Sequence, residues 1–205
     1  MLTLLLDIPQ RKIFHIEQKA KPACFLIVDH KAGGILVNTP DFSEPLLKEL
    51  TKQSDIDYLF FPSKFGCHDL QEWKTATGAE SIAHELEADA ITPDIDLKVN
   101  HKTKLTRTMD FVPMGGRTKG SCALFLKNLP GILFLGPTLS VGENQWPALI
   151  ENDDDESFES RMFGVLGLKD LKYDYVFTDD FDPDASKFGP GASEQVSQNI
   201  DLYFK

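Results

Sequence analysis

The sequence predicts an α/β fold. Two patterns carry this prediction: short apolar or alternating runs typical of strands fill much of the chain, and amphipathic helical stretches interrupt them. The order of segments is a third indication, because a strand meander followed by a helix-containing segment occurs twice along the chain. With 205 residues the chain suits one core, so we expect a single domain over residues 1–205.

The first part of the chain reads as strands followed by a strand, helix, strand unit. MLTLLLDIPQRK and KIFHIEQ predict strands, and ACFLIVDHKAGGILVNTP predicts a hairpin that turns at Lys-Ala-Gly-Gly. Ser43 is placed to cap a helix whose first turn suits Pro45. A buried strand from Tyr58 to Phe61 follows, and a second helix ends near Gly78 before a short strand through Ile82.

The second part repeats this order. From Ile91 to Leu139 we expect strands in AITPDIDLKV, LTRTMDFVPM and SCALFLKNLPGILFLGPTL, the last with a Leu-Pro-Gly turn. KYDYVFTDDFDP predicts a buried strand that enters an acidic loop, and GASEQVSQNIDLYFK predicts a closing helix. ENDDDESFESRMFGVLGL predicts a helix whose leading acids favour its dipole and whose apolar side carries Phe158, Met162, Val165 and Leu166.

Charge and cysteine usage narrow the function classes. The formal net charge of -11 repels phosphate backbones and anionic lipid surfaces, so we expect no nucleic-acid partner. No apolar segment is long enough to span a bilayer, so we expect no membrane partner. HKTKLTR, from His101 to Arg107, is interpreted as a solvated strand edge. Cys24, Cys67 and Cys122 lack the spacing of a disulfide framework or zinc ribbon, which favours a reducing cytoplasm.

Several stretches match the motifs of one known family. GGILVNTPDFSEPLLKEL, with Asn38 where Asp is common, and DIDYLFFPSKFGCHDLQEWKTATGAESIAHE resemble two segments of the metallo-β-lactamase superfamily. In that family the second segment leads into a His-x-His-x-Asp-His loop. GGRTKGSCALFL is similar to its Gly-His-Thr-x-Gly-Ser segment, and the resemblance covers roughly residues 23–181. It implies a four-layer αβ/βα sandwich in which two sheets pack between outer helices.

On this resemblance most of the metal-ligand positions have changed. In the loop, Ser63, Phe65 and Cys67 stand at altered positions and His68 alone survives. Arg117 stands for a ligand histidine, and Pro137 stands where a metal-bridging aspartate follows glycine. The last ligand histidine has Asp179 or Asp180 as its nearest match, and the choice between them stays open. We take these eight residues as the lining of the former metal pocket.

The family's chemistry rests on zinc ions that lower the pKa of a bound water. Since Ser63, Phe65 and Arg117 replace three histidines, we expect no metal in the first position. Cys67, His68 and Asp180, or Asp179 in its place, leave open one zinc, iron or manganese ion in the second. Arg117 paired with either aspartate would instead satisfy both groups without an ion. A nucleophilic Cys67 beside His68 is a further alternative.

The sequence therefore predicts a divergent, cytoplasmic metallo-β-lactamase-fold protein. We expect it to lack the dinuclear zinc site and any cofactor, and to act as a non-catalytic binding or regulatory protein. The alternative is a hydrolase of an ester, thioester or phosphoester that uses a rearranged single-metal site. A homodimer with contacts through an exposed loop around Trp146 is a third hypothesis, whereas Trp73 is expected in the core. The small molecule or protein that binds stays open.

Overall fold

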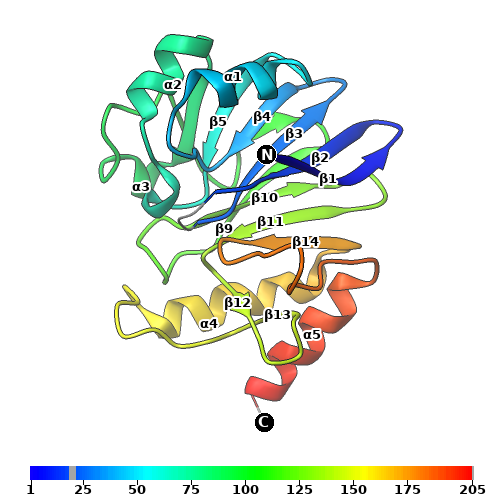
Figure 1. Cartoon of the computed structure of the whole chain (residues 1–205). Coiled ribbons are helices and arrows are strands. Elements are labelled where there is room, and N and C mark those ends of the chain that lie inside the picture. Colours follow the sequence, from blue (N-terminus) through cyan, green and yellow to red (C-terminus); the bar gives the residue numbers. More distant parts are fainter. Residues whose placement is uncertain (19–21, 205) are drawn as a thin grey trace.

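The computed structural model describes residues 1–18 and 22–204 as two β-sheets packed face to face, with helices on both outer faces (Figure 1). The first sheet changes character at β4: its pairs are antiparallel up to that strand and parallel beyond it. Parallel neighbours need crossover connections, which the helices α1 (Glu44–Thr51) and α2 (Leu70–Thr77) supply. In pairing order its strands are β1 Leu2–Ile8, β2 Arg11–Ile16, β3 Cys24–Asp29, β4 Gly33–Val37, β5 Ile56–Phe61, β6 Glu80–His84 and β7 Leu97–Val99.

The second sheet is antiparallel except for one edge, where β14 runs parallel to β11. In pairing order its strands are β14 Tyr175–Thr178, β11 Ile132–Gly136, β10 Cys122–Leu126, β9 Met109–Pro113 and β8 Lys104–Thr106. The connection from β11 to β14 holds a small hairpin and a helix that covers the outer face, and a last helix closes the chain. These elements are β12 Ser140–Val141, β13 Pro147–Ala148, α4 Phe158–Leu166, the 3-10 helix η2 Gly167–Asp170 and α5 Ala192–Tyr203.

Three apolar layers separate the four layers of secondary structure. Inward residues of both sheets, among them Phe25, Phe60 and Phe134, form the central layer. The outer face of the first sheet packs under α1 and α2, where Trp73 is fully buried and donates from Nε1 to the Pro40 carbonyl at 2.9 Å. The outer face of the second sheet packs under α4 and α5 around Val165. This arrangement is the predicted four-layer αβ/βα sandwich.

Local signals placed several boundaries correctly. Ser43 Oγ accepts the Leu46 amide and so begins α1. Gly78 ends α2 in the left-handed conformation at φ +69°, which glycine adopts at little cost. The basic stretch from His101 to Arg107 contains β8, which is an edge strand as predicted. No helix in residues 1–18 and 22–204 combines the length and the apolar character needed to cross a membrane.

Two expectations were wrong. AITPDIDLKV forms a strand only over Leu97–Val99, and this strand joins the first sheet beside β6. Before it, the carboxylate of Asp96 accepts the amide of Ser81, a side-chain bond in place of a backbone pairing. In α4, Leu166 is 38% exposed, whereas Arg161 on the inward side is fully buried. The groups that accept hydrogen bonds from Arg161, the carboxylate of Asp155 and the carbonyls of Thr138 and Ile150, all lie outside α4, so helical periodicity does not reveal them.

Candidate functional site

A pocket of about 360 Å³ lies at the rim where strand ends of the two sheets meet. Phe65 reaches it from the 3-10 helix η1 (Lys64–Gly66) after β5, Pro137 follows β11 and Asp179 follows β14. Arg117 enters from the loop before β10. With Asp180, five of the eight predicted pocket residues line this space.

The other three predicted residues do not line it. Ser63 is fully buried, and its Oγ accepts the Phe65 amide at the start of η1. Cys67 packs against the apolar layer under α1 and α2, and burial raises the pKa of its thiol to about 11. The backbone of His68 is fixed by Thr39, whose Oγ1 accepts the His68 amide at 2.9 Å and donates to its carbonyl at 2.6 Å. The altered loop therefore turns away from the pocket after Phe65.

Arg117 is held by contacts that the sequence did not predict. Its guanidinium carbon lies 5.0 Å from the ring centroid of Phe65, a cation-π contact. Its Nη2 lies 2.9 Å from Asp154 Oδ1, and its Nε lies 3.5 Å from Asp155 Oδ1. These two acids, rather than the expected Asp179 or Asp180, form its ion pairs. They reach Arg117 because the Ser157 amide donates to the Gly116 carbonyl, which joins the acidic loop to the arginine loop.

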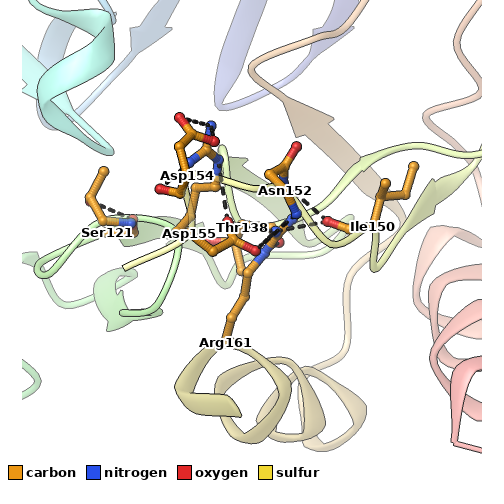
Figure 2. A network of polar contacts seen from close by, with 9 residues as sticks. Ser121, Thr138, Ile150, Asn152, Asp154, Asp155 and Arg161 are labelled. Carbon is orange, nitrogen blue, oxygen red and sulfur yellow. Dashed lines mark hydrogen bonds and ion pairs between the residues drawn. The ribbon is translucent and has the colours of Figure 1, made fainter. Parts of the chain in front are cut away.

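A second arginine anchors the same acidic loop from below (Figure 2). Arg161 projects from α4, where its Nη1 pairs with Asp155 at 2.9 Å and donates to the Ile150 carbonyl at 2.8 Å. Its Nε donates to the Thr138 carbonyl at 2.6 Å. Asp155 thus bridges Arg161 and Arg117. Two of the acids expected to favour the helix dipole, Asp154 and Asp155, serve as arginine partners.

Glu87, which the sequence did not single out, ties two of the pocket's loops together. It follows β6 on the short helix α3 (Glu85–Ala88) and is 1% exposed. Its Oε1 accepts the Lys64 amide at 2.7 Å, and its Oε2 accepts Thr118 Oγ1 and the Gly120 amide, each at 2.9 Å. From the sequence, an acid in a polar stretch, such as Glu87, is expected to be exposed to solvent. Only its place directly after a buried strand hints at another role.

The two adjacent aspartates have different environments. Asp180 accepts the Val141 amide at 2.9 Å and the Thr178 hydroxyl at 2.6 Å, so both of its oxygens serve the local backbone and strand end. Asp179 accepts Asn38 Nδ2 through Oδ1 at 2.9 Å, whereas its solvent-inaccessible Oδ2 has no hydrogen-bond partner among the described residues.

Asp179 is held in an unfavourable place for a charge. Burial raises its pKa to about 7; the Asn38 hydrogen bond lowers the pKa, the charge of Asp180 raises it and Arg117 lowers it. Asn38 is itself positioned by a second bond from Nδ2 to the Ala23 carbonyl. A pKa in this range places the titration of Asp179 near neutral pH.

Comparison with known proteins gives a consistent result for the fold. No protein-family model and no curated protein matches the chain. Solved structures do match. A metallo-β-lactamase from Pontibacter korlensis has a TM-score of 0.72 at 16% identity, with 100% of both chains covered. DIM-1 metallo-β-lactamase has 0.70 at 12%, with 98% of each chain covered. The chain has the metallo-β-lactamase fold.

A third neighbour extends this likeness. The metallo-β-lactamase with a HARLDQ motif from Cronobacter sakazakii has a TM-score of 0.66 at 12% identity, over 94% of this chain and 89% of its own. The fold predicted from the sequence motifs is thus confirmed. At such low identity the likeness concerns the backbone, so the chemistry of the pocket has to be judged from its own side chains.

The donor atoms present do not fit the zinc site that the fold implies. Arg117 brings a fixed positive charge to the pocket and Pro137 brings no side-chain donor. Among residues 1–18 and 22–204, no three His, Cys, Asp or Glu side chains gather closely enough to share a metal ion. The set Cys67, His68 and Asp180 is accordingly not assembled around one point. The side chains of the pocket therefore do not support a reaction step that passes through a bound metal.

Proposed function

We propose that this chain is a non-catalytic binding protein that keeps the metallo-β-lactamase fold and uses the rim pocket for a small ligand. One observation carries the proposal: Arg117 lines the pocket, fixed by Phe65, Asp154 and Asp155, at the position that resembles a ligand histidine. A guanidinium clamped in this way repels a divalent cation and still presents hydrogen-bond donors. The proposal includes the regulatory role and cytoplasmic location expected from the sequence.

The walls of the pocket suit a ligand with an apolar body and polar groups. Phe65, 37% exposed, offers a ring surface, and Pro137 and Leu139 add apolar walls. Asp179 and Asn152 supply polar groups on the same lining. Pockets of this size, mostly apolar with a few convergent polar groups, are typical of small-molecule sites.

The hydrolase alternative has less support from the geometry. Cys67 packs into an apolar layer, and its raised pKa keeps the thiol protonated at neutral pH, which disfavours both metal binding and nucleophilic attack. The homodimer hypothesis also loses part of its basis. Trp146 packs against the apolar layer under α4 and α5 and is only partly exposed, so it offers a smaller contact surface than a free loop residue.

A metal analysis tests the proposal. The protein is produced in medium supplemented with zinc, iron and manganese, and its bound metal is measured together with turnover of ester, thioester and phosphoester model substrates. We expect far less than one ion per chain and no turnover. The matched variants are His68→Ala and Asp180→Ala in the suspected set and His101→Ala on an exposed turn. The proposal would be refuted if the parent protein bound about one metal ion per chain, if His68→Ala or Asp180→Ala lost that ion, and if His101→Ala kept it.

A ligand screen tests the second part of the proposal, that the rim pocket binds a small molecule. Compounds that raise the melting temperature are retested on Phe65→Ala, which removes the exposed ring, and on Leu129→Ala, which trims a 78% exposed side chain outside the pocket lining. Loss of ring stacking should weaken binding about tenfold, as one aromatic contact contributes roughly 0.5–1.5 kcal/mol beyond its buried area. Leu129→Ala should bind like the parent protein. Hits that bind both variants equally would place the ligand elsewhere and contradict the proposal.

A further inference from the structure

A second pocket, of about 310 Å³, lies at the opposite end of the strands from the rim pocket. Strand β4 shows this placement: the turn before it, with His30 and Lys31, lines the second pocket, whereas Asn38 after it bonds Asp179 of the rim pocket. Strand β10 runs the other way, since Arg117 precedes it and Asn128 follows it. The two pockets therefore share no lining residue.

The second pocket contains a buried arginine with an unused donor. Arg11 is 1% exposed, and its Nε and Nη2 both donate to Asp29 Oδ2, at 3.1 and 2.9 Å. The other oxygen of Asp29 already accepts the amides of Lys31 and Ala32, at 2.9 and 3.0 Å. Arg11 Nη1 has no hydrogen-bond partner among the described residues. A buried donor without an acceptor is costly, so it marks a place where an acceptor is expected to bind.

The charge of this pocket has the opposite sign to that of the whole chain. Arg11 and Lys31 against Asp29 leave one net positive charge on its lining, within a chain of net charge -11. Lys31 is exposed, and its ammonium forms no ion pair within the part of the chain that the structure describes. In the rim pocket, by contrast, two aspartates outnumber the single arginine. Of the two pockets, only the second has a lining with a net positive charge, which favours an anion.

The walls of the second pocket are fixed by backbone bonds between turns. The His30 amide donates to the Gln10 carbonyl at 3.1 Å, and the Lys127 amide donates to the Thr108 carbonyl at 2.8 Å. The side chains of Gln10, Thr108 and Asn128 add neutral polar groups to the lining. A ligand thus meets a site whose backbone is already ordered, which lowers the entropic cost of binding.

We propose that this pocket binds a small oxyanion, a carboxylate or phosphate group, that accepts from Arg11 Nη1 and pairs with Lys31. Guanidinium groups suit such acceptors because their N–H groups lie in one plane, and a charged hydrogen bond is stronger than a neutral one. The site is independent of the proposed ligand of the rim pocket, so either proposal can fail alone.

Calorimetric titration with inorganic phosphate, and separately with acetate, tests the site. The titrations are run at low ionic strength, and sodium chloride serves as the reference salt. We expect saturable one-to-one binding of at least one of the two anions, and the arm that binds identifies the group. Lys31→Ala should weaken binding by about threefold to tenfold through the loss of one charge. Lys119→Ala removes the same charge elsewhere on the surface and should leave binding unchanged.

A double variant removes the buried donor while keeping the fold testable. Arg11→Met with Asp29→Asn deletes both charges of the pair and keeps an acceptor for the amides of Lys31 and Ala32. Replacing both partners of a buried pair is tolerated far better than removing one, and a melting curve verifies folding. Binding should then be lost. Absence of saturable binding by the parent protein, equal weakening in Lys31→Ala and Lys119→Ala, or unchanged binding in the folded double variant would each overturn the proposal.

Discussion

Glu87 and Asp179 are two acids of the same rim that the fold treats differently. Glu87 is almost completely buried, and its two oxygens accept three hydrogen bonds from Lys64, Thr118 and Gly120. The carboxylate of Asp179 accepts one hydrogen bond, from Asn38, and its second oxygen is buried without a partner among the described residues. Both carboxylates have lost water, but only that of Glu87 has a hydrogen-bond donor for each of its two oxygens.

This difference separates an acid that joins two loops from an acid that lines the pocket. Burial of a charge costs free energy unless hydrogen bonds or an opposite charge replace the lost solvation. Glu87 receives that replacement from the loops it joins, so its role is to hold Lys64 and Gly120 in place. Asp179 receives only the bond from Asn38, and it lines the pocket. Uncompensated groups of this kind gather at binding sites, which agrees with the place of Asp179 in the lining of the proposed ligand pocket.

Removal of Glu87 should have the largest effect on stability. Glu87→Ala leaves the Lys64 and Gly120 amides and the Thr118 hydroxyl without their acceptor, so we expect a loss of about 3 kcal/mol in the free energy of unfolding. Urea unfolding followed by circular dichroism measures it. Glu85→Ala, an exposed acid two residues earlier on α3, is the control and should change stability by less than about 0.5 kcal/mol. Equal losses in the two variants would contradict the structural role assigned to Glu87.

Gly66→Ala tests the other half of the comparison, because it disturbs Asn38, the residue that donates a hydrogen bond to Asp179. A Cβ at residue 66 would lie 1.7 Å from Asn38 Oδ1, so Asn38 would have to move and give up its bonds to Ala23 and Asp179. We expect a loss of about 2 kcal/mol in the free energy of unfolding. In Gly167→Ala the new Cβ meets nothing within 4 Å, and the backbone is helical, so stability should be unchanged or slightly higher. Melting curves of the two variants distinguish these outcomes.

The fold was predictable where the chain carries local signals. Ser43 and Gly78 mark helix ends because a side-chain oxygen caps an amide and a glycine tolerates positive φ, and both effects involve only a few neighbouring residues. The family motifs then supplied the arrangement of the layers. The strand expected before Leu97 failed because a side-chain bond between Asp96 and Ser81, 15 residues apart, takes the place of backbone pairing there.

The site was predictable only in part. Motif matching placed Arg117 and the pair Asp179 and Asp180 among the pocket positions, because it relies on order along the chain, and it left open which aspartate matches the ligand histidine. It gave no means of finding that Arg117 pairs with Asp154, 37 residues later, or that the buried Arg161 shares Asp155 with it. Those pairs depend on how α4 packs against the second sheet. Motif matching also gave no means of finding that the Cys67 side chain packs into the apolar layer under α1 and α2, because its orientation depends on the turn at the end of η1.

The smallest predicted effect concerns the charge of Asp179 and depends on pH. Its folded-state pKa of about 7 exceeds the ordinary value of 3.8, so the folded protein binds a proton between these values that the unfolded chain does not. The contribution of Asp179 to stability is therefore most favourable below about pH 4, falls as the pH rises from about 4 to about 7, and stays unfavourable above that range, where the folded carboxylate is ionised. Asp179→Asn should gain about 1–2 kcal/mol at pH 8, discounted because the residue is partly exposed, and less than half of that at pH 5, where the unfolded carboxylate is still largely ionised. Urea unfolding at both pH values measures the difference, and the exposed Asp94→Asn serves as the control. A gain of the same size at pH 5 and pH 8 would show that hydrogen bonds or charges replace the lost solvation of the ionised Asp179 carboxylate. The contrast between Asp179 and Glu87 would then be wrong.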